Sequence, residues 1–218
     1  MPHTTIILAN GQLAEPDVIL RRLADLDIGP VIAADGGSIH AGALGLILDM
    51  VIGDMDSIPD LLRESLEEQG TGFKQSPGHK DETDLELALI DAIDQGAKSI
   101  VVLGALGGRL DMSISNIMLL THPRLEGTPV ELWAGNQTAW LIRPPGQDLT
   151  GNPGDTLSLI PLGGDAQGVS THRLAYPLID ETLVFGPARG VSNVFETNTA
   201  RVDLRDGLLL VVHTPGRA

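Results

Sequence analysis

The sequence contains no cysteine, few aromatic residues and few basic residues, and each shortage excludes a class of protein. Without cysteine the chain can form no disulfide scaffold, thiolate zinc site or cysteine nucleophile. Aromatic residues make up only 3%, so the core must consist mainly of Leu, Ile, Val and Ala. Lys and Arg number 14 against 29 Asp and Glu, a formal net charge of −15. A surface this acidic repels nucleic-acid phosphates and anionic lipid, so an anionic ligand would need a local basic cluster or a metal.

Long apolar runs are also absent. No stretch approaches the roughly 18 apolar residues that a membrane-spanning helix needs, and the first residues lack a basic region followed by an apolar one. We therefore expect a soluble, cytoplasmic protein that binds neither nucleic acid nor membrane. The hydrophobic content of 42% is enough for a packed core. At about 150 residues per domain, the 218 residues correspond to one or two domains.

Residues 1–135 alternate short apolar runs with helical patterns, which predicts an α/β domain with a mainly parallel sheet flanked by helices. Asp17 is expected to cap the first helix, and Thr83 with Glu86 fits a capping box at the start of the clearest one. The expected strands are residues 4–9, 31–34, 50–53, 99–103 and 130–134, and the expected helices are residues 17–26, 38–44, 59–69, 83–95 and 111–120.

From residue 136 onward the pattern changes to short extended runs between Gly and Pro turns, without a sustained helical period. Residues 136–218 are therefore expected to form an all-β domain, a sandwich or a barrel. Within it, the Asp-Gly pair in Arg205-Asp206-Gly207 is typical of a tight hairpin turn. The expected strands are residues 138–143, 156–161, 183–185, 201–204 and 208–213.

A first polar cluster, GDMDS at residues 53–57, directly follows an expected strand, which is where α/β sheets place ligands. Gly53 permits a tight turn, after which Asp54 and Asp56 could converge on one cation. Carboxylate oxygens suit Mg²⁺, which binds one or two carboxylates together with substrate phosphates. The alternative is a solvated acidic turn in which Asp56 or Ser57 caps the next helix.

A second cluster, KDETDLE at residues 80–86, opens the helix of the capping box. Lys80, one of only three lysines, could meet a phosphate oxygen, and Asp84 could add a metal ligand. The alternative is purely local, because acidic residues in a first helical turn favour the helix dipole and Thr83 is explained by capping alone.

A third cluster, GALGGRLD at residues 104–111, leaves a buried strand and opens a helix. Such a glycine-rich turn presents backbone N–H groups to an anion, and Arg109 adds a planar, permanently charged fork for phosphate. The alternative is a flexible turn with a surface pair between Arg109 and Asp111. A weaker fourth piece, residues 35–37 (DGG), ends another expected strand and would let a ligand approach the backbone closely.

Together the four clusters describe a metal–nucleotide site, with carboxylates for Mg²⁺, cations for phosphate and glycines for close approach. The chain has neither the P-loop pattern GxxxxGK[ST] nor the dinucleotide fingerprint GxGxxG, so an NAD enzyme is disfavoured. In order and spacing the clusters resemble the thiamine pyrophosphokinase family, whose pattern is DGG, GDxDS, K-D-x-T-D-x-x-x-A, then GGRxD and an Asn. Here the last of these is Asn116, and residues 190–193 (GVSN) resemble a further element of that family.

The resemblance implies transfer of diphosphate from ATP to the hydroxyl of thiamine, giving thiamine diphosphate and AMP. It also implies a nucleotide-binding catalytic domain over residues 1–135, a thiamine-binding domain over residues 136–218, and a homodimer. One departure is Met112, where many members carry a polar residue such as His. Two alternatives stay open: a pyrophosphokinase for another heterocyclic alcohol such as a hydroxymethylpterin, and a non-catalytic nucleotide- or thiamine-binding module.

The candidate residues fall into three groups under this hypothesis. The carboxylates expected to hold Mg²⁺ are Asp54, Asp56 and Asp84, and those three together with Lys80 and Arg109 form the expected catalytic set. Residues expected to bind ATP are Asp35, Gly36, Gly37, Lys80, Thr83, Gly107, Gly108 and Arg109. Residues expected to contact the second substrate are Asp111, Ser192 and Asn193.

Overall fold

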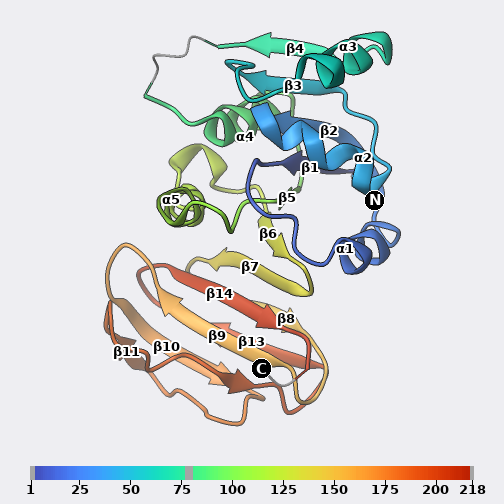
Figure 1. Ribbon diagram of the computed structural model, residues 1–218. Helices are drawn as coiled ribbons and strands as arrows, with labels where there is room; N and C mark the ends of the chain where they lie inside the picture. Colours follow the sequence, from blue (N-terminus) through green and yellow to red (C-terminus); the bar gives the residue numbers. More distant parts are fainter. Residues whose placement is uncertain (1–2, 77–80, 217–218) are drawn as a thin grey trace. The chain divides into compact units, whose positions relative to one another are not determined.

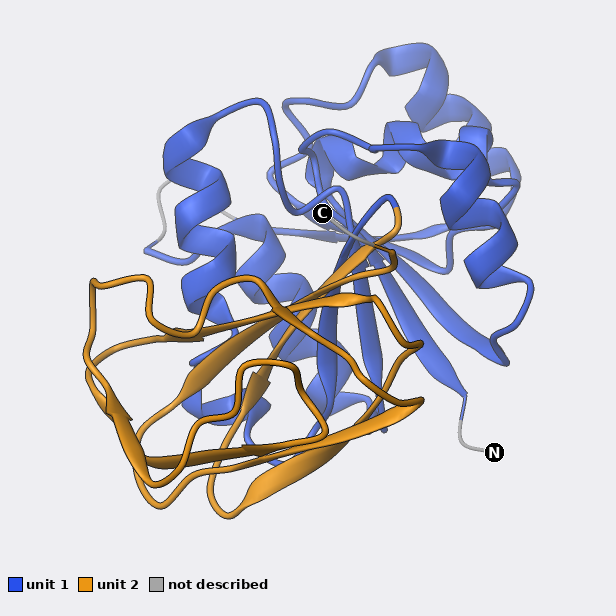
Figure 2. Cartoon of the chain, turned by 90° about the horizontal axis from the view of Figure 1, so that it is seen from below, with its two compact units in different colours: residues 1–135 blue, residues 136–218 orange. Residues whose placement is uncertain are grey.

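The computed structural model describes residues 3–76 and 81–216, and the chain divides into two compact units, Met1–Gly135 and Asn136–Ala218 (Figure 2). Unit 1 holds a parallel sheet in the order β6-β5-β1-β2-β3-β4 (Figure 1). Its strands are β1 (Thr4–Leu8), β2 (Ile28–Ala34), β3 (Met50–Gly53), β4 (Gly72–Gln75), β5 (Ile100–Leu103) and β6 (Val130–Ala134).

Helices lie on both faces of this sheet (Figure 2). Ile6 and Leu8 of β1 join the hydrophobic cluster that includes residues of the first three helices, and Ile7 points to the opposite face because side chains alternate along a strand. The helices are α1 (Pro16–Leu23), α2 (His40–Leu44), α3 (Asp60–Glu68), α4 (Asp84–Asp94) and α5 (Leu110–Leu119), with 3-10 turns at Asp35–Ile39 and Pro123–Leu125.

The strand order reverses once. From β1 the chain adds β2, β3 and β4 on one side, then returns to place β5 and β6 on the other side of β1. The carboxyl ends of β1 and β5 therefore flank a topological switch point, where crossover connections leave in opposite directions and open a crevice. The fold thus has a crevice at the end of β1 before any side chain is considered.

Unit 2 consists of two antiparallel sheets with the orders β12-β9-β14-β7 and β11-β10-β13-β8. Their inner faces share one core, in which Leu159, Val169 and Val202 are fully or almost fully buried. The strands are β7 (Gln137–Ile142), β8 (Gly146–Thr150), β9 (Thr156–Pro161), β10 (Ala166–His172), β11 (Glu181–Leu183), β12 (Asn193–Val194), β13 (Thr199–Asp203) and β14 (Leu209–Thr214).

The expected fold class is confirmed, since unit 1 is α/β and strands are the only regular elements in the described part of unit 2.

Two local predictions differ from the structure, and the first is the hairpin predicted at residues 205–207, which does not form. Strands β13 and β14, which flank it, pair in different sheets, so the Asp-Gly turn carries the chain from one sheet to the other. Asp17 does not cap α1, because Pro16, whose φ suits a first helical position, already begins the helix. No helix among the described residues is long and apolar enough to cross a membrane.

Candidate active site

A cavity of about 260 Å³ lies at the switch point of unit 1. Ala9, Asn10 and Gly11 line it from the end of β1, and Ala105 lines it from the end of β5. Ala34 is the last residue of β2, and the remaining lining residues come from the loops and helices that follow the strands: Asp35, Asp54, Asp56, Ser57, Asp84, Leu85, Gly107, Arg109, Met112 and Asn116. The structure therefore brings residues from all four polar clusters to one crevice.

Three carboxylates meet in this cavity. Asp35 follows β2, Asp54 follows β3 and Asp84 begins α4, and one oxygen of each lies within 4.8 Å of the others. Among the described residues this is the one group of at least three Asp, Glu or His side chains close enough to share a metal ion. The set differs from the expected one, because Asp35 takes part where Asp56 was expected.

Gly53 allows the three carboxylates to come together. A Cβ at residue 53 would lie 2.7 Å from the Cβ of Asp35, closer than real Cβ atoms come to a neighbour, and 3.2 Å from the Cγ of Asp84, which is tighter than most contacts. The left-handed residue of the following turn is Met55, with φ of 69°. A glycine is thus needed at residue 53 because two aspartates lie close to its Cα. The left-handed backbone of the turn comes two residues later, at Met55.

Asp35 is the most deeply placed of the three, with 4% of its surface exposed. Its Oδ1 is buried and has no hydrogen-bond partner among the described residues. Burial raises the pKa of Asp35, and the charges of Asp84 and Asp54 raise it further, against the lowering effect of hydrogen bonds from Ser57 and Gly36. An orphaned carboxylate oxygen beside two like charges is the environment that a bound cation would relieve.

Asp56 lines the same cavity without joining the three. Its backbone N–H donates to Oδ1 of Asp54 at 3.3 Å, and its carboxylate accepts a hydrogen bond from the Ser57 hydroxyl at 2.9 Å. The assignment of Asp56 as a metal ligand stays a prediction.

Arg109 stands at the cavity mouth, where its side chain is 74% exposed and forms a two-pronged pair with Asp111, at 3.1 Å from Nε and 2.6 Å from Nη2. This pair lowers the pKa of the Asp111 carboxyl, and the Met112 N–H bond contributes in the same direction. Asp111 itself does not line the cavity. The surface-pair alternative for these two residues therefore describes their geometry here, with Arg109 still facing the cavity.

Ser113 shapes the glycine-rich loop, and reading the sequence did not identify it. Its hydroxyl accepts a hydrogen bond from the Gly107 N–H and donates one to the Arg109 carbonyl, both at 3.0 Å. The two bonds tie the loop to the first turn of α5. The spacing of a hydroxyl four residues after the arginine is the signal that could have indicated this role.

The glycines of the fourth cluster have a packing role. A Cβ on Gly36 would lie 2.4 Å from the Asn10 side chain, and one on Gly37 would lie 2.1 Å from the Leu8 carbonyl oxygen. Neither glycine lines the cavity, and neither does Gly108. Their contact with ATP stays a prediction.

Of the second cluster, the structure shows the role of Thr83 but does not describe Lys80. Thr83 caps α4, since its Oγ1 accepts a hydrogen bond from the Glu86 N–H at 3.2 Å, and it does not line the cavity. Lys80 lies outside the described residues. Its expected phosphate contact therefore stays a prediction.

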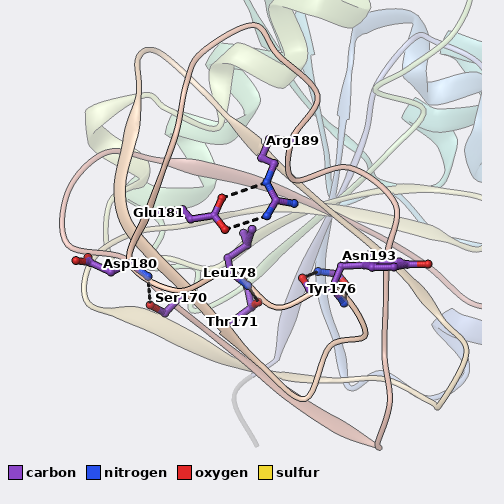
Figure 3. Close-up of polar contacts among 8 residues, drawn as sticks. All are labelled: Ser170, Thr171, Tyr176, Leu178, Asp180, Glu181, Arg189 and Asn193. Carbon is purple, nitrogen blue, oxygen red and sulfur yellow. Dashed lines mark hydrogen bonds and ion pairs between the residues drawn. The ribbon is translucent and has the colours of Figure 1, made fainter.

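Ser192 and Asn193 line a second cavity of about 260 Å³, which lies within unit 2. Asn193 is 5% exposed, and its amide is used internally: Nδ2 donates to the Tyr176 carbonyl at 2.7 Å, and Oδ1 accepts from the Tyr176 N–H at 2.9 Å (Figure 3). Arg189, at the same cavity, forms an ion pair with Glu181. The geometry gives Asn193 a role in holding the Tyr176 backbone, while its substrate contact stays a prediction.

Comparison with known proteins agrees with this arrangement. The family model "Thiamin pyrophosphokinase, catalytic domain" matches residues 28–132, and "Thiamin pyrophosphokinase, vitamin B1 binding domain" matches residues 146–209. A thiamine pyrophosphokinase of Bacillus subtilis is 26% identical over 185 residues, 84% of this chain and 86% of that protein.

Solved structures show the same fold. The crystal structure of thiamine pyrophosphokinase from Bacillus subtilis superposes with a TM-score of 0.86 at 25% identity, covering 97% of this chain and 99% of that one. Yeast thiamin pyrophosphokinase gives a TM-score of 0.81 at 15% identity, over 97% of this chain and 86% of that one. The two family models together span most of the chain, so the protein belongs to the thiamin pyrophosphokinase family.

Proposed function

We propose that the protein transfers a diphosphate group from ATP to the hydroxyl of thiamine, giving thiamine diphosphate and AMP. The observation that carries this proposal is the meeting of Asp35, Asp54 and Asp84 at the switch point of the α/β unit. Family membership supplies the reaction class. Phosphoryl transfer requires alignment and charge neutralisation, which a protein supplies with carboxylate-held cations and with basic side chains.

The three carboxylates fit a divalent cation, and we propose Mg²⁺. They offer only oxygen ligands, a buried oxygen of Asp35 lacks a partner among the described residues, and the absence of a Cβ on Gly53 leaves them room to converge. When bound, Mg²⁺ neutralises phosphate charge and orients the transferred group. Asp35, Asp54 and Asp84 would hold the cation, and Asp56, at the cavity wall, would reach it directly or through water.

Arg109 and Lys80 would hold phosphate oxygens as negative charge moves toward the AMP leaving group. Because Arg109 is largely exposed and paired with Asp111, we propose that it exchanges this carboxylate for phosphate when ATP binds. Gly107 lines the cavity and would let the loop backbone approach the phosphates. Met112 also lines the cavity, so the position where the family resemblance predicts a polar residue offers apolar contact here.

Residues 136–218 would provide thiamine binding, since the matched vitamin B1 binding domain lies within them. Ser192 and Asn193 mark the cavity that we propose for this role. A homodimer and a cytoplasmic location are proposed with the family, and sedimentation analysis of the purified chain tests the first of these.

An assay of AMP release tests the proposed reaction. The protein is incubated with ATP, MgCl₂ and either thiamine, a hydroxymethylpterin or no acceptor. We expect AMP and thiamine diphosphate in equal amounts, only with thiamine, and no product with EDTA. AMP formed only with the pterin, or with no acceptor at all, would overturn the proposal. Asp84→Asn should lose the activity, whereas the nearby Glu82→Gln, at an exposed position, should keep it.

A further inference from the structure

Helix α5 buries an amide while three of its large apolar side chains, Leu110, Ile114 and Met118, are exposed. Asn116 is 6% exposed and is the one buried residue of the helix, whereas Leu110 is 75% exposed and Ile114 is 50% exposed. A buried polar side chain costs stability unless its hydrogen bonds are made. An arrangement that buries Asn116 in preference to Leu110 and Ile114 therefore needs a reason beyond packing.

Only half of the Asn116 amide is satisfied. Its Nδ2 donates to the Ala105 carbonyl at 2.7 Å. Because a carbonyl oxygen can only accept, this bond fixes which end of the amide faces Ala105. The other end, Oδ1, is buried and has no hydrogen-bond partner among the described residues. The amide is therefore held in place with one free acceptor.

Asn116 is one of the residues that line the cavity described above. The other side chains there that can accept a hydrogen bond are the carboxylates, which the proposed cation would satisfy, the Asn10 amide and the Ser57 hydroxyl. Leu85, Ala105 and Met112 add apolar wall. An amide oxygen is uncharged, so a neutral hydrogen-bond donor suits it better than a metal ion would. A neutral N–H or O–H group that enters the cavity would meet the acceptor without the cost of burying a further charge.

We propose that Asn116 is a substrate-recognition residue whose Oδ1 accepts a hydrogen bond from a neutral N–H or O–H donor of the bound substrate. This inference rests on the proposed function, and both substrates carry such donors. ATP has the adenine amino group and the ribose hydroxyls, and thiamine has the pyrimidine amino group. A site built around a buried acceptor rejects analogues that lack the donor, because the acceptor is then left unpaired.

The experiment combines substrate analogues with variants. Wild type and Asn116→Leu, which keeps the side-chain volume and removes both polar atoms, are compared with ATP, purine riboside triphosphate and 2′-deoxy-ATP by binding calorimetry. They are also compared with thiamine and a thiamine analogue that lacks the pyrimidine amino group, by turnover. Thr121→Val is the matched control, because Thr121 follows the end of α5 and the change removes one side chain–backbone hydrogen bond to the last turn of that helix, away from the cavity.

We expect wild type and Thr121→Val to prefer one natural substrate over its donor-lacking analogue by about tenfold or more, and Asn116→Leu to lose that preference. The analogue that shows the effect identifies the donor. An unchanged preference ratio in Asn116→Leu, or no preference in wild type, would overturn the proposal. If Asn116→Leu does not fold, the same preference ratio is measured for Asn116→Ala, and the same outcomes apply. Failure of wild type to convert thiamine would instead count against the reaction, because the calorimetry measures ATP binding independently.

Discussion

Asp35 in unit 1 and Asp155 in unit 2 are buried to the same extent, but they have opposite surroundings. Both are 4% exposed. Asp155 accepts hydrogen bonds from the Gly216 N–H at 2.7 Å and the Asn152 N–H at 2.8 Å, and its Oδ2 lies 3.0 Å from Nε2 of His213. Asp35 has an orphaned Oδ1 and two carboxylates as neighbours.

The pKa values follow this difference. Burial raises the pKa of Asp35, and its neighbouring carboxylates raise it further. Burial would also raise the pKa of Asp155, but the hydrogen bonds from Gly216, Asn152 and His213 outweigh it and lower the pKa. Burial alone therefore does not distinguish a structural carboxylate from a ligand-binding one. The distinguishing property is whether the fold itself supplies the partners.

Replacing Asp35 should have the largest effect. Asp35→Asn keeps the shape and removes the charge, so AMP release should fall by about 100-fold or more. Without divalent cations the variant should be more stable than wild type, because it no longer buries a charge beside Asp54 and Asp84. Kinetics and urea unfolding in EDTA measure the two effects, and Asp25→Asn, at an exposed position, is the control. A variant that is both active and less stable would place Asp35 in the same class as Asp155.

Replacing Asp155 should change stability and leave the chemistry intact. Asp155→Ala leaves the N–H groups of Gly216 and Asn152 without an acceptor, and His213 loses its partner. We expect a loss of about 3 kcal/mol in the free energy of unfolding. Urea unfolding followed by circular dichroism measures it. A loss below about 0.5 kcal/mol would mean that the three bonds contribute little net stability.

The two variants should also show opposite dependence on pH when the protein is free of divalent cations. The folded pKa of Asp35 is raised, so its contribution to stability is present below the unfolded pKa and is lost as the pH rises through the folded pKa. The folded pKa of Asp155 is lowered, so its contribution is present above the unfolded pKa and is lost as the pH falls through the folded pKa.

Measured from acid to neutral pH, the stability that Asp35→Asn gains over wild type should therefore grow as the pH rises. The stability that Asp155→Ala loses should shrink as the pH falls. Urea unfolding midpoints at several pH values test both trends. Parallel profiles for the two variants would show that the surroundings of the two aspartates do not differ in the way described.

The contrast between the aspartates also shows what sequence could predict. Strand ends and polar clusters located the crevice, because parallel strands place their following loops at one edge of a sheet. They did not show that Asp35, rather than Asp56, joins Asp54 and Asp84, since that depends on the backbone turn at Met55 and the close approach at Gly53. Asp155 gave no signal at all, because Gly216 and His213 lie about 60 residues away along the chain.

Elements were missed for a related reason. Strands β4 (GFKQ) and β10 (AQGVSTH) are short or carry few apolar residues, and neighbouring strands supply their hydrogen bonds. The Asp-Gly turn at residues 206–207 predicted local pairing, yet β13 and β14 belong to different sheets. In each case long-range pairing decided a structure that local residue preferences could not indicate.

Asn193 tests whether the contrast extends to a residue with both properties, since it lines a cavity like Asp35 and is satisfied internally like Asp155. If holding the Tyr176 backbone is its role, Asn193→Ala should raise the KM for thiamine severalfold and leave the KM for ATP unchanged, because only the unit 2 cavity loses its support. Asn193→Asp can still accept from the Tyr176 and Val194 N–H groups, at 2.9 Å in each case, and loses only the bond that it donates.

The aspartate variant should therefore fall between wild type and alanine. A substrate contact through Nδ2 would instead make Asn193→Asp as defective as alanine, because both variants lack that donor. Asn198→Ala, at an exposed position of the same unit, serves as the control for both. The order of the KM values for thiamine thus separates a residue that supports the cavity wall from one that reads the ligand. That is the same distinction that separates Asp155 from Asp35.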